Sequence, residues 1–418
     1  MKKKQAARST DGGGALLVPG YQQFGGRQAE AGALRNVLAH SGIVAAHTGE
    51  PFTEALLFGI GGGIGLGYFV YESGDFTSLF VATRITTTEN AQTGFPLTIC
   101  QRLGLVATMQ TASTAPAAEK KLEQALAEGY PVIVWVDPRI LPYYGPPGTY
   151  HTLVVYGFDE GKKEVYIADR YDGALTLTPG ELTAARKGEG AIKFRALVIA
   201  PPATKRVDVK KAVQEGLGDF CAQMREGFGP ANFKSNFGLK ALEKWADLLT
   251  EPKDKRGWPK FFPRGPRLYN ALLSAYDQIE NRGSGGSAFR ELYADFLVEA
   301  GEILKQPKLN AVADQFRDSA RLWSALSAAL LPDSVPPFKE TKQLATKKRT
   351  LFEKKGAAAR DETQAINARL AEIKSQVEKA FPMSEAEVQD LLADLRQRVL
   401  AIHAVEEKAV EALQALVR

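Results

Sequence analysis

Strand-like segments occur only in the first half of this 418-residue chain, and that restriction decides its fold class more than any other feature. Closely spaced strands favour an antiparallel sheet, here preceded by an amphipathic helix over residues 29–40 and accompanied by a charged helix over residues 117–129. We therefore predict an α+β domain over residues 15–202. The predicted strands are residues 78–84, 130–137, 151–158, 164–169 and 194–200.

The rest of the chain is predicted to be helical, in two parts. Residues 203–335 show apolar faces of period 3.6 over residues 232–249, 288–304 and 309–330, with loops predicted at residues 251–265 and 281–287. In residues 336–418, apolar side chains recur at spacings of 4 and 3 on both sides of Phe381 and Pro382, and Ser384 and Glu387 have the spacing of a capping box. This pattern predicts an antiparallel helical hairpin that either braces the other domains or associates with a second copy of the chain.

Composition excludes several classes of function. The chain has two cysteines and four histidines and no HExxH sequence, so neither a disulfide framework nor a metal site is expected, and no motif indicates a cofactor. Much of the net charge of +5 lies in a basic tail, residues 1–14, which we expect to be disordered. Because the remaining chain has no basic stripe and no apolar run of signal or membrane length, we expect a cytoplasmic protein that binds neither nucleic acid nor membrane.

A glycine-rich run over residues 59–67 is the most conspicuous local motif. It has neither the GxGxxG nor the GxxxxGK[ST] spacing with which backbone N–H groups hold a phosphate, so nucleotide binding is disfavoured. Two interpretations stay open: close packing of the backbone, or a loop that lets a ligand approach the main chain. Under the second, Gly61, Gly62 and Gly63 are candidate substrate-binding residues.

A histidine and an aspartate fall at matching ends of two neighbouring strands. His151 begins one predicted strand and Asp169 ends the next, and these two ends lie side by side in an antiparallel pair. A carboxylate bonded to an imidazole orients the ring and stabilises its protonated form, as a general base in acyl transfer requires. The pair is therefore a candidate catalytic pair, although a histidine at a strand end is also a common structural hydrogen-bonding group.

The segment from Gln23 to Leu38 resembles the opening of papain-like cysteine enzymes, especially the bacterial double-glycine leader peptidases. A closer resemblance is to the protein H family of butirosin biosynthesis, through GRQA (26–29), ALRN (33–36), EALLFGIGGG (54–63), DPRILPY (137–143), His151 and ADR (168–170). FRELYADFL (289–297) is similar to the uncharacterised helical domain that usually follows in this family. The resemblance covers roughly residues 15–330 and implies a papain-like N-terminal domain.

The resemblance implies transfer of an acyl group from a carrier-protein thioester to an amine, with Gln23 at the oxyanion-hole position. The His-Cys of the family is replaced by Gln28 and Ala29, and neither Cys100 nor Cys221 has the sequence context of a nucleophile. Two hypotheses stay open. Either acyl transfer is direct, with His151 as base, Asp169 as its orienting group and Gln23 as oxyanion donor, or the protein is a catalytically inactive relative that binds a ligand or partner. Candidate substrate-binding residues besides the glycines are Gln28, Glu30, Asp137 and Tyr143.

Overall fold

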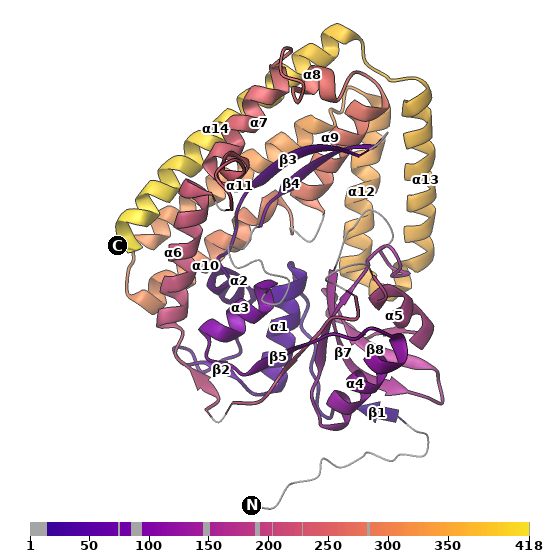
Figure 1. Ribbon diagram of the computed structural model, residues 1–418, viewed down its shortest axis with the longest axis vertical. Coiled ribbons are helices and arrows are strands. Elements are labelled where there is room, and N and C mark those ends of the chain that lie inside the picture. Colours follow the sequence, from indigo (N-terminus) through magenta and orange to yellow (C-terminus); the bar gives the residue numbers. More distant parts are fainter. Residues whose placement is uncertain are drawn as a thin grey trace, which may run out of the picture. The chain divides into compact units, whose positions relative to one another are not determined.

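The computed structural model describes residues 15–73, 76–84, 94–144, 151–188, 193–202, 204–227, 229–281 and 285–417 (Figure 1). The basic tail predicted to be disordered lies outside these residues. The chain divides into two compact units: unit 1 is Met1–Leu57, Thr88–Ala212 and Thr350–Asn367, and unit 2 is Phe58–Thr87, Val213–Arg349 and Ala368–Arg418. The division predicted from the sequence, with boundaries near residues 202 and 335, is a different partition of the chain and stays a prediction.

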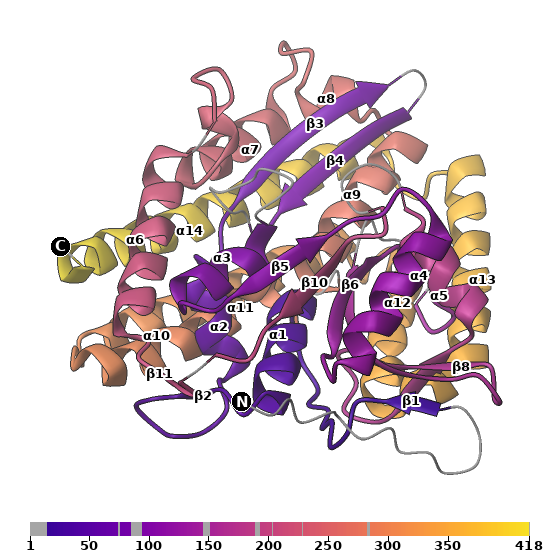
Figure 2. The ribbon, with the colours of Figure 1, turned by 60° about the horizontal axis from the view of Figure 1, so that its bottom comes forward.

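Unit 1 is built on an antiparallel sheet, as predicted. Within the described residues its strand order is β5-β10-β6-β7-β8-β9, with β1 also paired to β7, and Figure 2 shows β5, β10 and β6 side by side. The strands are β1 (Ala15–Leu17), β5 (Ala107–Gln110), β6 (Val132–Val136), β7 (His151–Asp159), β8 (Glu164–Ala168), β9 (Leu175–Leu177) and β10 (Ala196–Ile199). A short parallel pair of β2 (Val44–Ala45) and β11 (Arg206–Val207) completes its strands.

Helices cover this sheet because its central strands are apolar on both faces. Every residue of β6 is buried. Leu122 of α4 (Ala115–Ala127) and Leu182 of α5 (Pro179–Arg186) share one core cluster with Val132 and Val134 of β6. Helices α1 (Ala29–His40) and α3 (Gly94–Arg102) belong to the same unit, and α1 packs against β6 and β7. The helix predicted over residues 29–40 is confirmed at both ends.

Unit 2 is mainly helical, as predicted for the second half of the chain. Its helices are α6 (Lys210–Glu226), α7 (Leu239–Thr250), α8 (Trp258–Phe261), α9 (Pro266–Glu280), α10 (Arg290–Leu304), α11 (Leu309–Leu330) and α14 (Glu385–Val417). Trp245 and Trp323 are fully buried in its core, with ring centroids 6.2 Å apart. Helices α2 (Glu54–Ile60), α12 (Pro336–Lys355) and α13 (Arg360–Lys379) each contribute residues to both units.

Three local predictions need correction. The strand predicted at residues 78–84 is β4 (Phe76–Ala82), but it pairs with β3 (Gly67–Ser73) in a separate hairpin of unit 2 and not with the main sheet. The helix predicted from residue 232 begins at Leu239, because Gly238 has a φ of +62° that a right-handed helix cannot contain. The loop predicted at residues 251–265 contains the short helix α8, which its buried Trp258 anchors.

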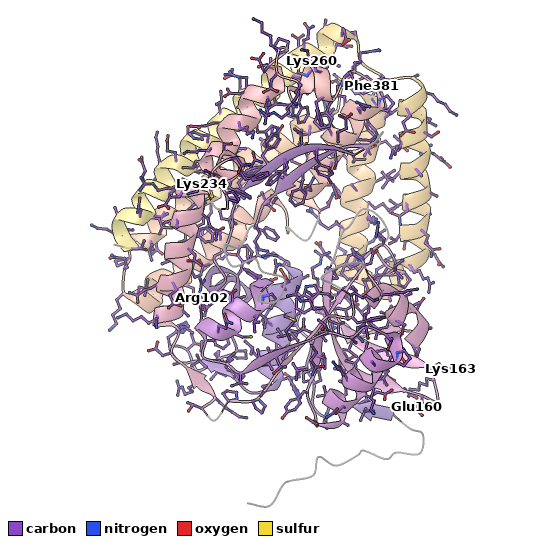
Figure 3. All side chains as sticks on the ribbon, viewed as in Figure 1. Arg102, Glu160, Lys163, Lys234, Lys260 and Phe381 are labelled. Atoms are coloured by element: carbon purple, nitrogen blue, oxygen red, sulfur yellow. The ribbon has the colours of Figure 1, made fainter. Side chains whose placement is uncertain are left out.

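The apolar seam of the C-terminal helices is buried within unit 2. Val388, Leu392 and Leu395 of α14 join the same core as Ile373 and Val377 of α13, and α14 packs along α7 and α11. Phe381 lies at the turn between α13 and α14 (Figure 3). Its ring contacts Phe338 edge-on, with centroids 6.0 Å apart. The predicted capping box is present, with Glu387 accepting from the Ser384 N–H at 2.7 Å. The seam thus braces unit 2, and self-association through it stays a prediction.

Among the described residues, no helix combines the length and apolar character needed to cross a membrane.

Candidate active site

His151 and Asp169 form the pair that the sequence predicts. His151 is the first residue of β7 and Asp169 directly follows β8, and these strands pair antiparallel. The imidazole Nε2 lies 2.8 Å from Asp169 Oδ1, with the histidine side chain 10% exposed and the aspartate side chain fully buried. An Nε2–H donated to the carboxylate leaves Nδ1 as the basic ring nitrogen.

Asp169 is surrounded by donors. The Tyr143 hydroxyl donates to Oδ2 at 3.2 Å, the Tyr144 hydroxyl to Oδ1 at 3.4 Å, and the Arg170 backbone N–H to Oδ1 at 2.6 Å. Burial alone raises the pKa of this carboxyl, but the facing His151 and Arg170 outweigh burial and lower the pKa below the ordinary aspartate value. The aspartate is therefore held as an anion that can orient an imidazole.

The loop before α1 is hydrogen-bonded to the residues that follow Asp169. The Gln23 side-chain Nε2 donates to the Tyr171 carbonyl, and the Gly26 N–H donates to the Arg170 carbonyl at 2.9 Å. The Arg170 guanidinium in turn donates to the Arg27 carbonyl at 3.5 Å. These contacts join the start of α1 to the aspartate end of the candidate catalytic pair. Gln23 still has a second amide N–H, which an oxyanion would need.

Ala29, at the predicted nucleophile position, is the first residue of α1. Gln28 is the helix N-cap, because its Oε1 accepts from the Ala31 N–H at 2.6 Å, and its Nε2 lies 3.3 Å from a carboxylate oxygen of Glu30. Both side chains are buried. The structure thus gives Gln28 and Glu30 a role at the helix start, and substrate contact by either stays a prediction.

Glu54, which is not among the residues predicted from the sequence, binds the backbone at the start of this helix. Its carboxylate accepts from the Arg27 N–H at 2.8 Å and from the Gln28 N–H at 2.5 Å. Burial raises the pKa of Glu54 even though these N–H groups oppose the shift. The only sequence signal for Glu54 is its place in the first turn of α2. That signal is weak, because many helices begin with an acidic residue.

The remaining predicted residues fall into two groups. Tyr143 lies in the site, where its hydroxyl donates to Asp169. Asp137 follows Val136, which pairs with His151, but its carboxylate is bound by Arg139 at 2.9 Å and this lowers its pKa. The glycines lie in unit 2, where a Cβ on Gly63 would overlap the Tyr293 ring and one on Gly62 would approach Gln223. Close packing accounts for Gly63 and a positive φ of +101° for Gly62, and contact of Gly61, Gly62 or Gly63 with substrate stays a prediction.

Three aromatic residues that were not predicted from the sequence lie at or near the His151–Asp169 pair. Tyr144 contacts the His151 ring edge-on at 5.1 Å, and its hydroxyl accepts from Arg170 Nε at 2.9 Å. Phe352, from α12, stacks on Tyr143 and lies 6.3 Å from Tyr171. No local pattern could have found Phe352, since it is about 200 residues away in sequence from the groups it contacts.

Neither cysteine belongs to this site. Cys100 is fully buried on α3 and Cys221 lies in α6, and burial raises their pKa values to about 12 and about 11. Both thiols therefore stay protonated at neutral pH. Within the described part of the chain, no cluster of three or more potential metal ligands occurs.

A helix packed on an antiparallel sheet, with a histidine–aspartate pair beside the segment that leads into the helix, defines a papain-like domain. Residues 28–170 match the family described as "Butirosin biosynthesis protein H, N-terminal", and residues 180–381 match a "Domain of unknown function (DUF4872)". The chain thus has the two-domain architecture of the butirosin biosynthesis protein H-like family. No curated protein sequence matches it significantly.

Proposed function

We propose that the protein transfers an acyl group directly from a carrier-type thioester to an amine, with His151 as general base. The observation that carries this proposal is the intact pair, with His151 Nε2 at 2.8 Å from a buried Asp169. The resemblance places the nucleophile at position 29, which is an alanine in this chain. Three donors besides the imidazole hold Asp169, so the carboxylate is oriented as a base partner requires.

The chemistry needs no cysteine because a thioester is already activated. The amine nitrogen attacks the thioester carbonyl, His151 removes the proton that the nitrogen must lose, and the C–S bond breaks. The departing sulfur then takes up a proton, and the products are an amide and a free thiol. Positioning the two substrates lowers the barrier by removing the entropy cost of their encounter.

The start of α1 supports the stabilisation of negative charge on the carbonyl oxygen. A helix leaves its first backbone N–H groups without partners inside the helix, and its N-terminus carries partial positive charge. Glu54 fixes the backbone of Arg27 and Gln28 directly before Ala29. The second amide N–H of Gln23 would act as oxyanion donor beside this helix start.

A test compares the full chain with two histidine variants. Each protein is incubated with acyl-pantetheine thioesters and a panel of primary amines, and the amide is measured by mass spectrometry. We expect His151→Ala to lower transfer by at least about 10²-fold, the low end for a general base. His403→Ala is the matched control, because His403 also lies beside a carboxylate, Glu243 at 3.4 Å, but in unit 2.

Transfer that is unchanged in His151→Ala contradicts the proposal. A second candidate function is favoured by one observation, the alanine at position 29, where the resemblance places the nucleophile. In that case the protein is an inactive relative that binds the acyl donor, an acyl carrier protein for example, without reacting. Acyl-pantetheine that binds by calorimetry but gives no amide with any amine of the panel supports this second function.

A further inference from the structure

Phe352 links the helical part of the chain to the candidate catalytic pair. It lies near the end of α12, within the residues that match the domain of unknown function, and it is 3% exposed. Its ring belongs nevertheless to the core of unit 1, together with strand residues of the sheet.

The ring of Phe352 supports both tyrosines that donate to Asp169. It stacks on Tyr143 with centroids 5.3 Å apart and planes 15° apart, and lies 4.7 Å from Tyr144. The Tyr143 hydroxyl reaches Oδ2 of Asp169 and the Tyr144 hydroxyl reaches Oδ1, so each carboxylate oxygen receives a donor whose ring rests on Phe352.

The neighbours of Phe352 act on the same group of residues. The Arg170 guanidinium carbon lies 5.8 Å from the centroid of the Phe352 ring and 5.4 Å from that of Tyr144. Gly356, with a φ of +53°, is so close to the Tyr171 ring that a Cβ there would overlap it. The end of α12 and the turn after it therefore cover Tyr143, Tyr144, Arg170 and Tyr171 together.

We propose that Phe352 is a positioning residue for the His151–Asp169 pair: it holds the Tyr143 and Tyr144 hydroxyls on the carboxylate and keeps water away from it. The inference deepens the proposed function, on which it rests for its catalytic meaning. A core residue without this role would stabilise the fold only. Phe352 differs because it packs against two tyrosine rings, and the hydroxyls of both tyrosines donate to Asp169.

The chain offers a matched control on the same helix. Phe338 of α12 is also buried, at 0% exposed, and also stacks on a tyrosine, Tyr269 at 5.4 Å, but in unit 2. Phe352→Leu and Phe338→Leu therefore remove the same ring from two buried positions of one helix, each stacked on a tyrosine. A general loosening of the fold would affect both variants alike, whereas positioning of the pair involves Phe352 alone.

The experiment observes the ring proton that His151 shares with Asp169, by NMR of the full chain labelled with ¹⁵N-histidine and without substrate. The resonance is assigned by its disappearance in His151→Gln. We expect a downfield, slowly exchanging ring N–H in the wild type and in Phe338→Leu. In Phe352→Leu its exchange with water should be faster by about tenfold, the size of a lost ring-stacking interaction, and in Phe352→Ala it should vanish.

Equal exchange rates in the two leucine variants overturn the proposal, as does a wild type without a protected ring proton. If Phe352→Ala does not fold, the leucine pair still decides. The test is independent of acyl transfer: a protein that never forms amide but shows the expected exchange rates retains Phe352 as a positioning residue and loses the proposed function. Where transfer is measurable, Phe352→Leu should lower kcat more than it changes KM.

Discussion

Arg290 and Glu406 form an ion pair in which both side chains are fully buried, with Nε 2.8 Å from Oε1. Glu406 also accepts from the Ser319 hydroxyl and the Trp323 indole N–H, and Arg290 donates to the Ala288 carbonyl at 2.8 Å. The pair therefore fastens α14 to α10 and α11 inside unit 2. Burial raises the pKa of Glu406, but Arg290 and the hydrogen bonds outweigh burial and lower it overall.

Removing one partner of this pair should destabilise unit 2 strongly. Glu406→Leu leaves the Arg290 charge buried and unpaired, at a cost of about 3–5 kcal/mol in the free energy of unfolding. The double variant Arg290→Met with Glu406→Leu should recover most of that loss. Urea unfolding followed by tryptophan fluorescence measures both. Arg369→Ala, at the half-exposed Arg369–Glu340 pair, is the control and should cost about 1 kcal/mol or less.

A cysteine introduced at position 29, where the resemblance places a nucleophile, should be the reactive thiol of the chain. In Ala29→Cys the new side chain stands at the start of α1, where the helix N-terminus favours a thiolate. Burial raises the pKa of Cys100 to about 12 and of Cys221 to about 11, so both serve as internal controls. Iodoacetamide at pH 7 followed by peptide mass spectrometry should label position 29 first. Labelling no faster than that of the native cysteines would show that the helix start does not activate a thiol.

Glu54 should give the unfolding free energy a characteristic pH dependence. Because its pKa in the folded protein is raised above the unfolded value, the folded state binds more protons between the two values, and the stabilisation is lost as pH rises through that interval. Glu54→Gln removes this slope and leaves one backbone N–H poorly paired, at about 1–3 kcal/mol. The stability gap between wild type and variant should therefore be larger at pH 4.5 than at pH 7. A gap that widens with rising pH would reverse the sign assigned to this carboxyl.

Two glycine substitutions in unit 2 should act in opposite directions. Gly63 has a φ of +66° and faces the Tyr293 ring, so Gly63→Ala combines backbone strain with overpacking and should cost about 2–5 kcal/mol. Gly218 lies inside α6 with open space around its Cα, so Gly218→Ala should raise the unfolding free energy by about 0.5–1 kcal/mol. Thermal unfolding of both variants tests the pair, and equal melting temperatures would show that the glycine run is loosely packed.

Periodicity predicts the individual elements of this chain well. The helices over residues 29–40 and 309–330 are found with the predicted ends, and the strand beginning at His151 is found with its predicted partner. Each depends on neighbours in sequence, since amphipathic spacing, caps and turns are local properties. The predicted approach of His151 and Asp169 also follows from local rules, because the short turn between β7 and β8 brings these two strand ends together.

Long-range partners are what the sequence leaves open. The β4 strand has a normal strand pattern, yet its pattern does not say that β3 is its partner or that α9 and not the main sheet covers it. Glu54 looks like an ordinary first-turn glutamate until its carboxylate is found on the Arg27 and Gln28 N–H groups. Both cases are decided by which surfaces meet during folding.

The sequence by itself determined the α+β N-terminal part, the helical remainder, the candidate histidine–aspartate pair, and the alanine at the predicted nucleophile position. Those features follow from the spacing and the types of residues along the chain. The tertiary structure alone decided that Phe352 of α12 lies beneath Tyr143 and Tyr144, and that Glu406 of α14 pairs with Arg290. The physical reason is the same in both cases: apolar burial is non-directional, so a buried ring or charge finds its partner through the packing of whole elements and not through any local pattern.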